Sequence, residues 1–151
     1  MMTKDKKTAL VYAVDLLARQ EQSSSRLREK LLRKGYGADE AEAAILRLQE
    51  KHYLNDEDAC ARQFQFLYED SRNSVKQICA KLMQRGFEGS LVQSCIPGDI
   101  HERELKAAAR CLALKFKPSS DRQKMLANLY GKGFGSEVAR KAVDAFLESA
   151  E

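Results

Sequence analysis

The chain has 151 residues, of which 44% are hydrophobic and 32% are charged, and its net charge is +4. Prolines and glycines are few, alanine, leucine and long charged residues abound, and no alternating apolar pattern occurs, so we expect an all-α protein without a sheet. No stretch approaches transmembrane length, and Asp15 and Arg19 interrupt the first apolar run too early for a signal peptide. We therefore expect a cytoplasmic protein that is not bound to a membrane.

Residues 1–8 form a short basic tail, and a series of helical segments follows it. Apolar and small residues recur with a helical period from Ala9 to Leu17 and predict the first helix. The second helix begins after Ser23, whose side-chain oxygen can accept from first-turn amides, and ends at Gly35, which can adopt the left-handed conformation. The apolar positions of a third helix follow at Ala41, Ala44, Ile45 and Leu48.

The second helix and its ending occur three times with identical internal spacing. In each copy the leucine and the aromatic residue take the two positions that touch in a Schellman cap, so we expect these aromatic side chains in the core and not in a binding site. Written as cap, two apolar residues, basic residue, glycine and aromatic residue, the copies are Ser23, Leu27, Leu31, Lys34, Gly35 and Tyr36; Ser74, Ile78, Leu82, Arg85, Gly86 and Phe87; and Asp121, Met125, Leu129, Lys132, Gly133 and Phe134.

Similar apolar columns flank the second and third copies, so each copy belongs to a three-helix unit. Pro97 closes the second unit, and Pro118 ends the first helix of the third unit. Isolated units of this size bury too little surface to be more than marginally stable, so we expect them to stack on one another. The first helix of the third unit is predicted to bury Ala107, Ala108, Cys111 and Leu114. The predicted segments are a basic tail at 1–8 and three-helix repeats at 9–54, 55–98 and 99–151.

The chain lacks the sequence patterns of catalytic, metal and cofactor sites. Its four cysteines include no Cys-x-x-Cys pair, and three of them occupy columns in which another repeat has alanine or phenylalanine. We interpret them as small buried hydrophobes rather than metal ligands or redox groups. The glycines around Gly133 have no preceding strand and no Gly-Lys-Ser/Thr ending, which argues against a phosphate-binding loop. We predict no enzyme, no cofactor and no metal.

Positive charge is concentrated in the second helix of each repeat. Residues 23–36 carry a net charge of +4, residues 71–87 carry +4 and residues 119–134 carry +2, whereas the rest of the chain sums to −6. The helix dipole accounts for the cation before each terminating glycine. The remaining charge predicts a repeated basic surface for an extended acidic partner, either a nucleic-acid backbone or an acidic protein filament. A solvated basic face without a partner is the alternative.

The three helix endings, together with the junction at residues 53–64 (Tyr-Leu-Asn-Asp-Glu-Asp-Ala-Cys-Ala leading to Phe64), resemble the RecX family of bacterial regulatory proteins. The resemblance covers residues 8–148. It implies an elongated, curved array of three tandem three-helix repeats. It also implies a protein that binds the RecA recombinase and its filament on single-stranded DNA. Such a protein modulates, mainly by inhibition, ATP hydrolysis, filament growth and strand exchange in homologous recombination and the SOS response.

The sequence departs from the family pattern, and alternatives stay open. Residues 69–74 stand where family members often carry a basic Gly-Pro run, which puts the contacts of that run in doubt. A helical module that binds nucleic acid directly through its basic second helices is the main alternative, and a helical adaptor for an unrelated partner is another. We expect a monomer. The candidate residues for contact with the filament or with DNA are Arg26, Lys30, Arg33, Arg72, Lys76, Lys81, Arg122 and Lys124.

Overall fold

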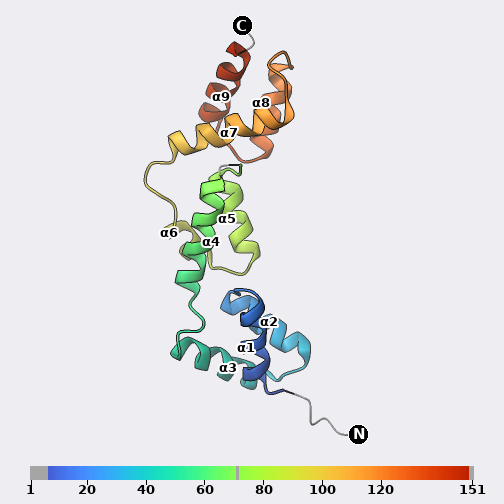
Figure 1. The fold of residues 1–151 in the computed structure, drawn as a ribbon, viewed down its shortest axis with the longest axis vertical. Coiled ribbons are helices and arrows are strands. Elements are labelled where there is room, and N and C mark those ends of the chain that lie inside the picture. The colour runs from blue at the N-terminus through green and yellow to red at the C-terminus, as the bar shows by residue number, and fades with distance from the viewer. Residues whose placement is uncertain (1–6, 71, 150–151) are drawn as a thin grey trace.

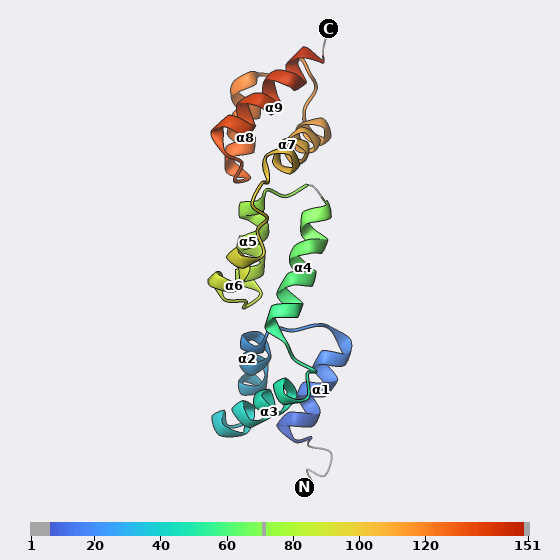
Figure 2. The same ribbon diagram turned by 90° about the vertical axis from the view of Figure 1, so that its left-hand side faces the viewer.

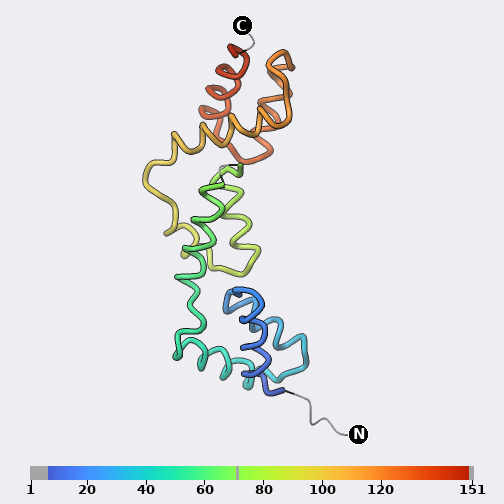
Figure 3. The backbone as a smooth tube through the Cα atoms, in the orientation of Figure 1, coloured from blue at the N-terminus to red at the C-terminus, as the bar shows by residue number. Residues whose placement is uncertain are grey.

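The computed structural model describes residues 7–70 and 72–149. Over these residues it contains nine α-helices and no strand, which confirms the all-α prediction. The helices follow one another in groups of three along an elongated molecule, with α1–α3 at one end and α7–α9 at the other (Figure 1 and Figure 3). Their bounds are α1 Ala9–Arg19, α2 Ser24–Lys34, α3 Ala38–Glu50, α4 Asp56–Asp70, α5 Val75–Gln84, α6 Gly89–Ser94, α7 His101–Lys115, α8 Arg122–Gly131 and α9 Ser136–Glu148.

Each group of three helices packs around its own hydrophobic cluster. Leu27 and Ile45 are fully buried in the first cluster, Ile78 in the second and Met125 in the third. The divisions that we predicted at 54/55 and 98/99 fall in the segments between α3 and α4 and between α6 and α7. The three clusters are separate, so no common apolar core joins one repeat to the next over the described residues.

The repeated helix ending has the predicted structure in all three copies. Each capping side chain accepts a hydrogen bond from a first-turn amide. Each aromatic residue donates its amide to the carbonyl of the leucine five residues earlier, at 3.1–3.2 Å, which is the long hydrogen bond of a Schellman cap. The glycines that permit this ending have positive φ angles, which are 113° at Gly35, 97° at Gly86 and 92° at Gly133.

The second helices of the three repeats stack end to end. The hydroxyl of Ser23, at the start of α2, donates to the Arg85 carbonyl at the end of α5, at 2.7 Å. The hydroxyl of Ser74, at the start of α5, donates to the Lys132 carbonyl at the end of α8, at 2.6 Å. Helices α8, α5 and α2 therefore form a column along the long axis of the molecule (Figure 2). Within this column the positive end of one helix dipole meets the negative end of the next.

Glycine also permits the close approach of the stacked helices. A Cβ atom on Gly86 would lie 2.5 Å from the Ser23 hydroxyl oxygen, and one on Gly133 would lie 2.9 Å from that of Ser74. A Cβ atom on Gly35, at the open end of the column, would have no neighbour within 4 Å among the described residues. At Gly86 and Gly133 the glycine therefore serves both the helix ending and the junction between repeats.

A carboxylate from the following repeat completes each junction. Asp56, at the start of α4, accepts from the Ser24 amide at 2.8 Å. At the second junction Glu104, in the first turn of α7, accepts from the Val75 amide at 3.2 Å and from the Arg103 guanidinium at 2.7 Å. These carboxylates satisfy amides that the first turn of a helix leaves without a partner.

The prediction for the first helix of the third repeat is wrong at one position. Leu114 is 69% exposed, whereas Leu112 is fully buried. The buried stripe of α7 runs from Glu104 through Ala107, Ala108 and Cys111 to Leu112, with the spacing of one helix face. Glu104 extends this stripe at its start, where its carboxylate accepts from the Val75 amide of α5, and Leu114 lies outside the stripe.

Candidate functional site: basic clefts at the repeat junctions

A cleft with a basic lining lies at each junction between repeats. The first junction cleft has a volume of about 610 Å³, and the second junction cleft has a volume of about 350 Å³. The basic residues of the first junction cleft are Arg26, Lys30, Lys81 and Arg85. Those of the second junction cleft are Arg72, Lys81, Lys115 and Lys132.

The two clefts are built from equivalent positions. Lys30 in the first cleft and Lys81 in the second have the same place in successive second helices, and so do Arg85 and Lys132, which each precede a terminating glycine. Lys81 also lines the first cleft, so α5 connects the two. End-to-end stacking therefore places the last cation of one second helix beside a mid-helix lysine of the preceding repeat, once at each junction.

In the first junction cleft, most basic groups have no acidic partner among the residues that the structure describes. Neither Lys30 nor Lys81 forms an ion pair with any described residue, and Arg85 donates to the Gln63 side chain at 2.7 Å. Arg26 hydrogen-bonds the Gln84 carbonyl, with a loose contact of 3.7 Å to Glu29.

The first junction cleft also holds one acidic side chain, Glu21. Partial burial opposes its ionisation, but hydrogen bonds from Arg62 and Gln63 outweigh that effect and lower the pKa of Glu21. Glu21 is therefore ionised and paired with Arg62. Because Arg62 balances its charge, Glu21 does not neutralise the lysines of the cleft.

The second junction cleft combines cations with an exposed leucine. Arg72 is paired with Asp70 at 3.3 Å, whereas Lys132 has no ion-pair partner among the described residues. The Nζ atom of Lys115 lies 5.9 Å from the centre of the Phe116 ring. Leu114 lines the same cleft, so the lining of the second junction cleft is partly apolar.

The structure brings half of the predicted partner-binding residues to the clefts. Arg26, Lys30 and Lys81 line the first cleft, and Arg72 and Lys81 line the second. The other four predicted residues line neither: Arg33 pairs with Glu29 at 3.4 Å, Arg122 pairs with Asp144 at 3.2 Å, and Lys76 and Lys124 are exposed on α5 and α8. Partner binding by all eight residues stays a prediction.

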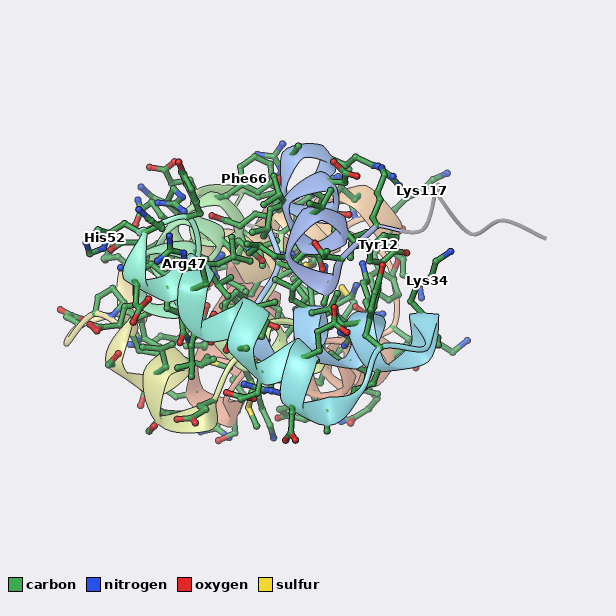
Figure 4. All side chains as sticks on the ribbon, turned by 90° about the horizontal axis from the view of Figure 1, so that it is seen from below. Tyr12, Lys34, Arg47, His52, Phe66 and Lys117 are labelled. Atoms are coloured by element: carbon green, nitrogen blue, oxygen red, sulfur yellow. The ribbon has the colours of Figure 1, made fainter. Side chains whose placement is uncertain are left out.

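Sequence reasoning misses three cations of the clefts. The helix dipole by itself explains a cation at Arg85 and at Lys132, so the sequence gives no reason to assign them to a binding site. Lys115 stands out in the sequence only because it interrupts an apolar column. The repeat register does not separate the cleft cations from Lys34, which is the equivalent of Arg85 and Lys132 in the first repeat but lies at the open end of the column. There it sits 5.4 Å from the centre of the Tyr12 ring, and the two residues lie on the same side of the molecule in Figure 4.

The chemistry of the clefts is that of anion binding. Lysine and arginine side chains offer hydrogen-bond donors to carboxylates or phosphates. Among the described residues no group of three or more histidine, cysteine or acidic side chains is placed to hold a metal ion. None of the described helices is both long and apolar enough to cross a membrane.

Comparison with known proteins places the chain in a family. The model of the first three-helix domain of RecX matches residues 9–48, which contain α1, α2 and most of α3. Regulatory protein RecX of Thermus thermophilus is 34% identical over 143 residues, which are 95% of this chain and 95% of that protein. This chain belongs to the RecX family of regulatory proteins. The resemblance seen in the sequence is thereby confirmed.

Other members of the RecX family agree in length and fold. Regulatory protein RecX of Prosthecochloris aestuarii is 33% identical, and the match covers 97% of this chain and 99% of that one. The crystal structure of RecX from Lactobacillus salivarius has a TM-score of 0.77 at 17% identity, over 91% of this chain and 94% of that one. The fold of three-helix repeats is therefore shared at low sequence identity, and the relatives are named as regulators rather than as enzymes.

Proposed function

We propose that this RecX-family chain binds the RecA recombinase filament on single-stranded DNA and inhibits its ATP hydrolysis, growth and strand exchange. In this role it acts as a monomer in the cytoplasm, in homologous recombination and the SOS response. The family membership supports a regulatory role, and the resemblance described above supplies the recombinase as the partner.

The observation that carries the proposal is the repetition of the basic cleft. A helical protein filament presents the same acidic groups at regular intervals, and an array of repeats can meet several of them at once. The two junction clefts offer equivalent cation pairs, Lys30 with Arg85 and Lys81 with Lys132, on one elongated molecule. None of these four side chains forms an ion pair with a described residue, so their charge is available to a partner.

The test is a titration of the protein against recombinase on single-stranded DNA, with ATP hydrolysis and DNA occupancy followed together. The K30E/K81E variant reverses one lysine in each cleft, and both side chains are free of ion pairs within the described structure. The matched control is K51E/K106E, which reverses two exposed lysines that line neither cleft.

We expect the native chain and the control to inhibit hydrolysis equally, and K30E/K81E to need at least about tenfold more protein, because two charge reversals remove attractive contacts. Equal inhibition by both variants would contradict a role of the clefts. Binding to bare single-stranded DNA with a steep salt dependence, without any effect on hydrolysis, would instead support the nucleic-acid-binding module.

A further inference from the structure

Two thiols meet in the core of the middle repeat. Cys60 lies in the first half of α4, and Cys95 follows the last residue of α6. Their sulfur atoms are 3.9 Å apart, and both cysteines are free. The sequence pattern indicates separate small hydrophobes at these positions, so their contact is a new observation.

The thiol contact is confined to the middle repeat. The register of the repeats places Ala9 and Ala44 at the equivalent positions of the first repeat, and Ala107 and Ala142 at those of the third. All four alanines are buried, so the first and third helices of those repeats approach each other with small side chains in between. In the middle repeat cysteine stands at both positions. A simple filling of space would not need sulfur at both of them.

The two thiols differ in access to solvent. Cys60 is completely buried. Cys95 is only half-buried, and it lines a cleft of about 370 Å³ between α4 and α6, together with Glu57 and Ser94. A small oxidant can therefore reach Cys95 first. Burial, and then the neighbouring Cys95, raise the pKa of Cys60 to about 12, so the Cys60 thiol is protonated at neutral pH and is not the first sulfur to react.

We propose that Cys95 and Cys60 are a peroxide-sensitive pair that forms a disulfide within the middle repeat. The Cys95 sulfur, as thiolate, attacks one oxygen of hydrogen peroxide; the O–O bond breaks, hydroxide leaves, and Cys95 becomes a sulfenic acid. The Cys60 sulfur then attacks the Cys95 sulfur, the S–O bond breaks, and the hydroxyl leaves with the Cys60 proton as water. Two thiols and one hydrogen peroxide thus yield one disulfide and two waters, with both sulfurs oxidised and the peroxide reduced.

The disulfide would fix the shortest element of the repeat. Helix α6 spans only Gly89–Ser94, whereas α3 and α9 have 13 residues each. A bond from Cys95 to Cys60 ties the end of this short helix to α4 and restricts the unfolded chain between the two residues. We expect oxidation to raise the melting temperature by about 5–10 °C. The recombinase titration is a separate measurement, so this inference and the proposed function fail independently.

The test treats the full chain with a small excess of hydrogen peroxide, then maps its peptides by mass spectrometry without reduction. The native chain should lose two hydrogen atoms and yield a Cys60–Cys95 cross-linked peptide. Cys60→Ala places in the middle repeat the alanine of the other repeats, and it should accumulate a sulfenic acid at Cys95 that dimedone traps. Cys95→Ala should form no cross-link. Cys79→Ser is the matched control, because Cys79 is another cysteine of this repeat, and it should keep the cross-link and the rise in melting temperature.

Three results would overturn the proposal. One is a native chain whose Cys60 and Cys95 both remain alkylatable after peroxide treatment. Another is a cross-link that joins Cys95 to Cys79. The last is a native Cys95 that proceeds to sulfinic acid without forming a disulfide.

Discussion

The glycine of the repeated motif ends its helix and, at Gly86, also allows the close junction between repeats. Substitution of Gly86 by alanine affects both roles, whereas substitution of Gly35 affects the helix ending alone. Both glycines end a helix at positive φ, so alanine at either position costs about 1 kcal/mol of backbone strain. Only at Gly86 would the new Cβ lie 2.5 Å from the Ser23 hydroxyl, with the Arg26 amide nitrogen at 3.4 Å. That approach disrupts the hydrogen bond of the buried Ser23 hydroxyl to the next repeat, which adds about 1–3 kcal/mol.

We therefore expect Gly35→Ala to lower the free energy of unfolding by about 1 kcal/mol, and Gly86→Ala to lower it by about 3 kcal/mol. For a chain of this size these values correspond to melting temperatures lower by about 3 °C and about 9 °C. The measurement is thermal and urea unfolding followed by circular dichroism. Equal losses for the two variants would refute the close-packed junction.

A double-mutant cycle sharpens this prediction. Ser23→Ala removes the hydroxyl that the Cβ at position 86 would strike, and the other atoms near that Cβ are at 3.4 Å. In the Ser23→Ala background, Gly86→Ala should therefore cost only the strain seen at Gly35, a coupling of about 2 kcal/mol. Additive losses would mean that the serine hydroxyl and the glycine do not meet.

Three further predictions concern the junctions. Ser74→Ala removes a helix cap and a hydrogen bond between repeats, and it should lower the free energy of unfolding by about 2 kcal/mol. Asp121→Ala removes a cap alone and should lower it by about 1 kcal/mol. Equal losses in urea unfolding would contradict the stacking. Glu104→Ala leaves the half-buried Arg103 without its carboxylate and should cost about 3 kcal/mol in the same assay. A loss below about 1 kcal/mol would count against this role. The pKa of Glu21 is lowered on folding, so its stabilisation is present above about pH 4.5 and is lost as the pH falls below that. Glu21→Gln should therefore flatten the fall in stability below about pH 4.5, and an unchanged fall would exclude this role.

Local patterns in the sequence predict the helices and their ends correctly. Spacing alone locates the serine caps, the left-handed glycines and the Schellman bonds, because these depend on residues within one helix. The contact between Ser23 and Arg85 depends on which helix ends meet in space, and the repeat pattern does not specify that. The prediction for Leu114 is wrong because the repeat column does not specify which edge of the α7 stripe is covered, and in the structure Leu112 is buried instead.

The candidate site is predictable in part. Counting charge by helix selects Lys30 and Lys81, and the structure places both in the lining of the clefts, whereas their contact with a partner stays a prediction. The cations before the glycines have a local explanation in the helix dipole, and nothing local distinguishes Arg85 and Lys132 from Lys34. Their place in the clefts follows from end-to-end stacking, which brings each of them to the preceding repeat.

The inhibition of recombinase ATP hydrolysis on single-stranded DNA tests the central claim most directly. The native chain and K51E/K106E should inhibit at the same concentration, whereas K30E/K81E, with an unchanged melting curve, should require at least about tenfold more protein. Inhibition by K30E/K81E at the native concentration would contradict the claim that the junction clefts hold the filament.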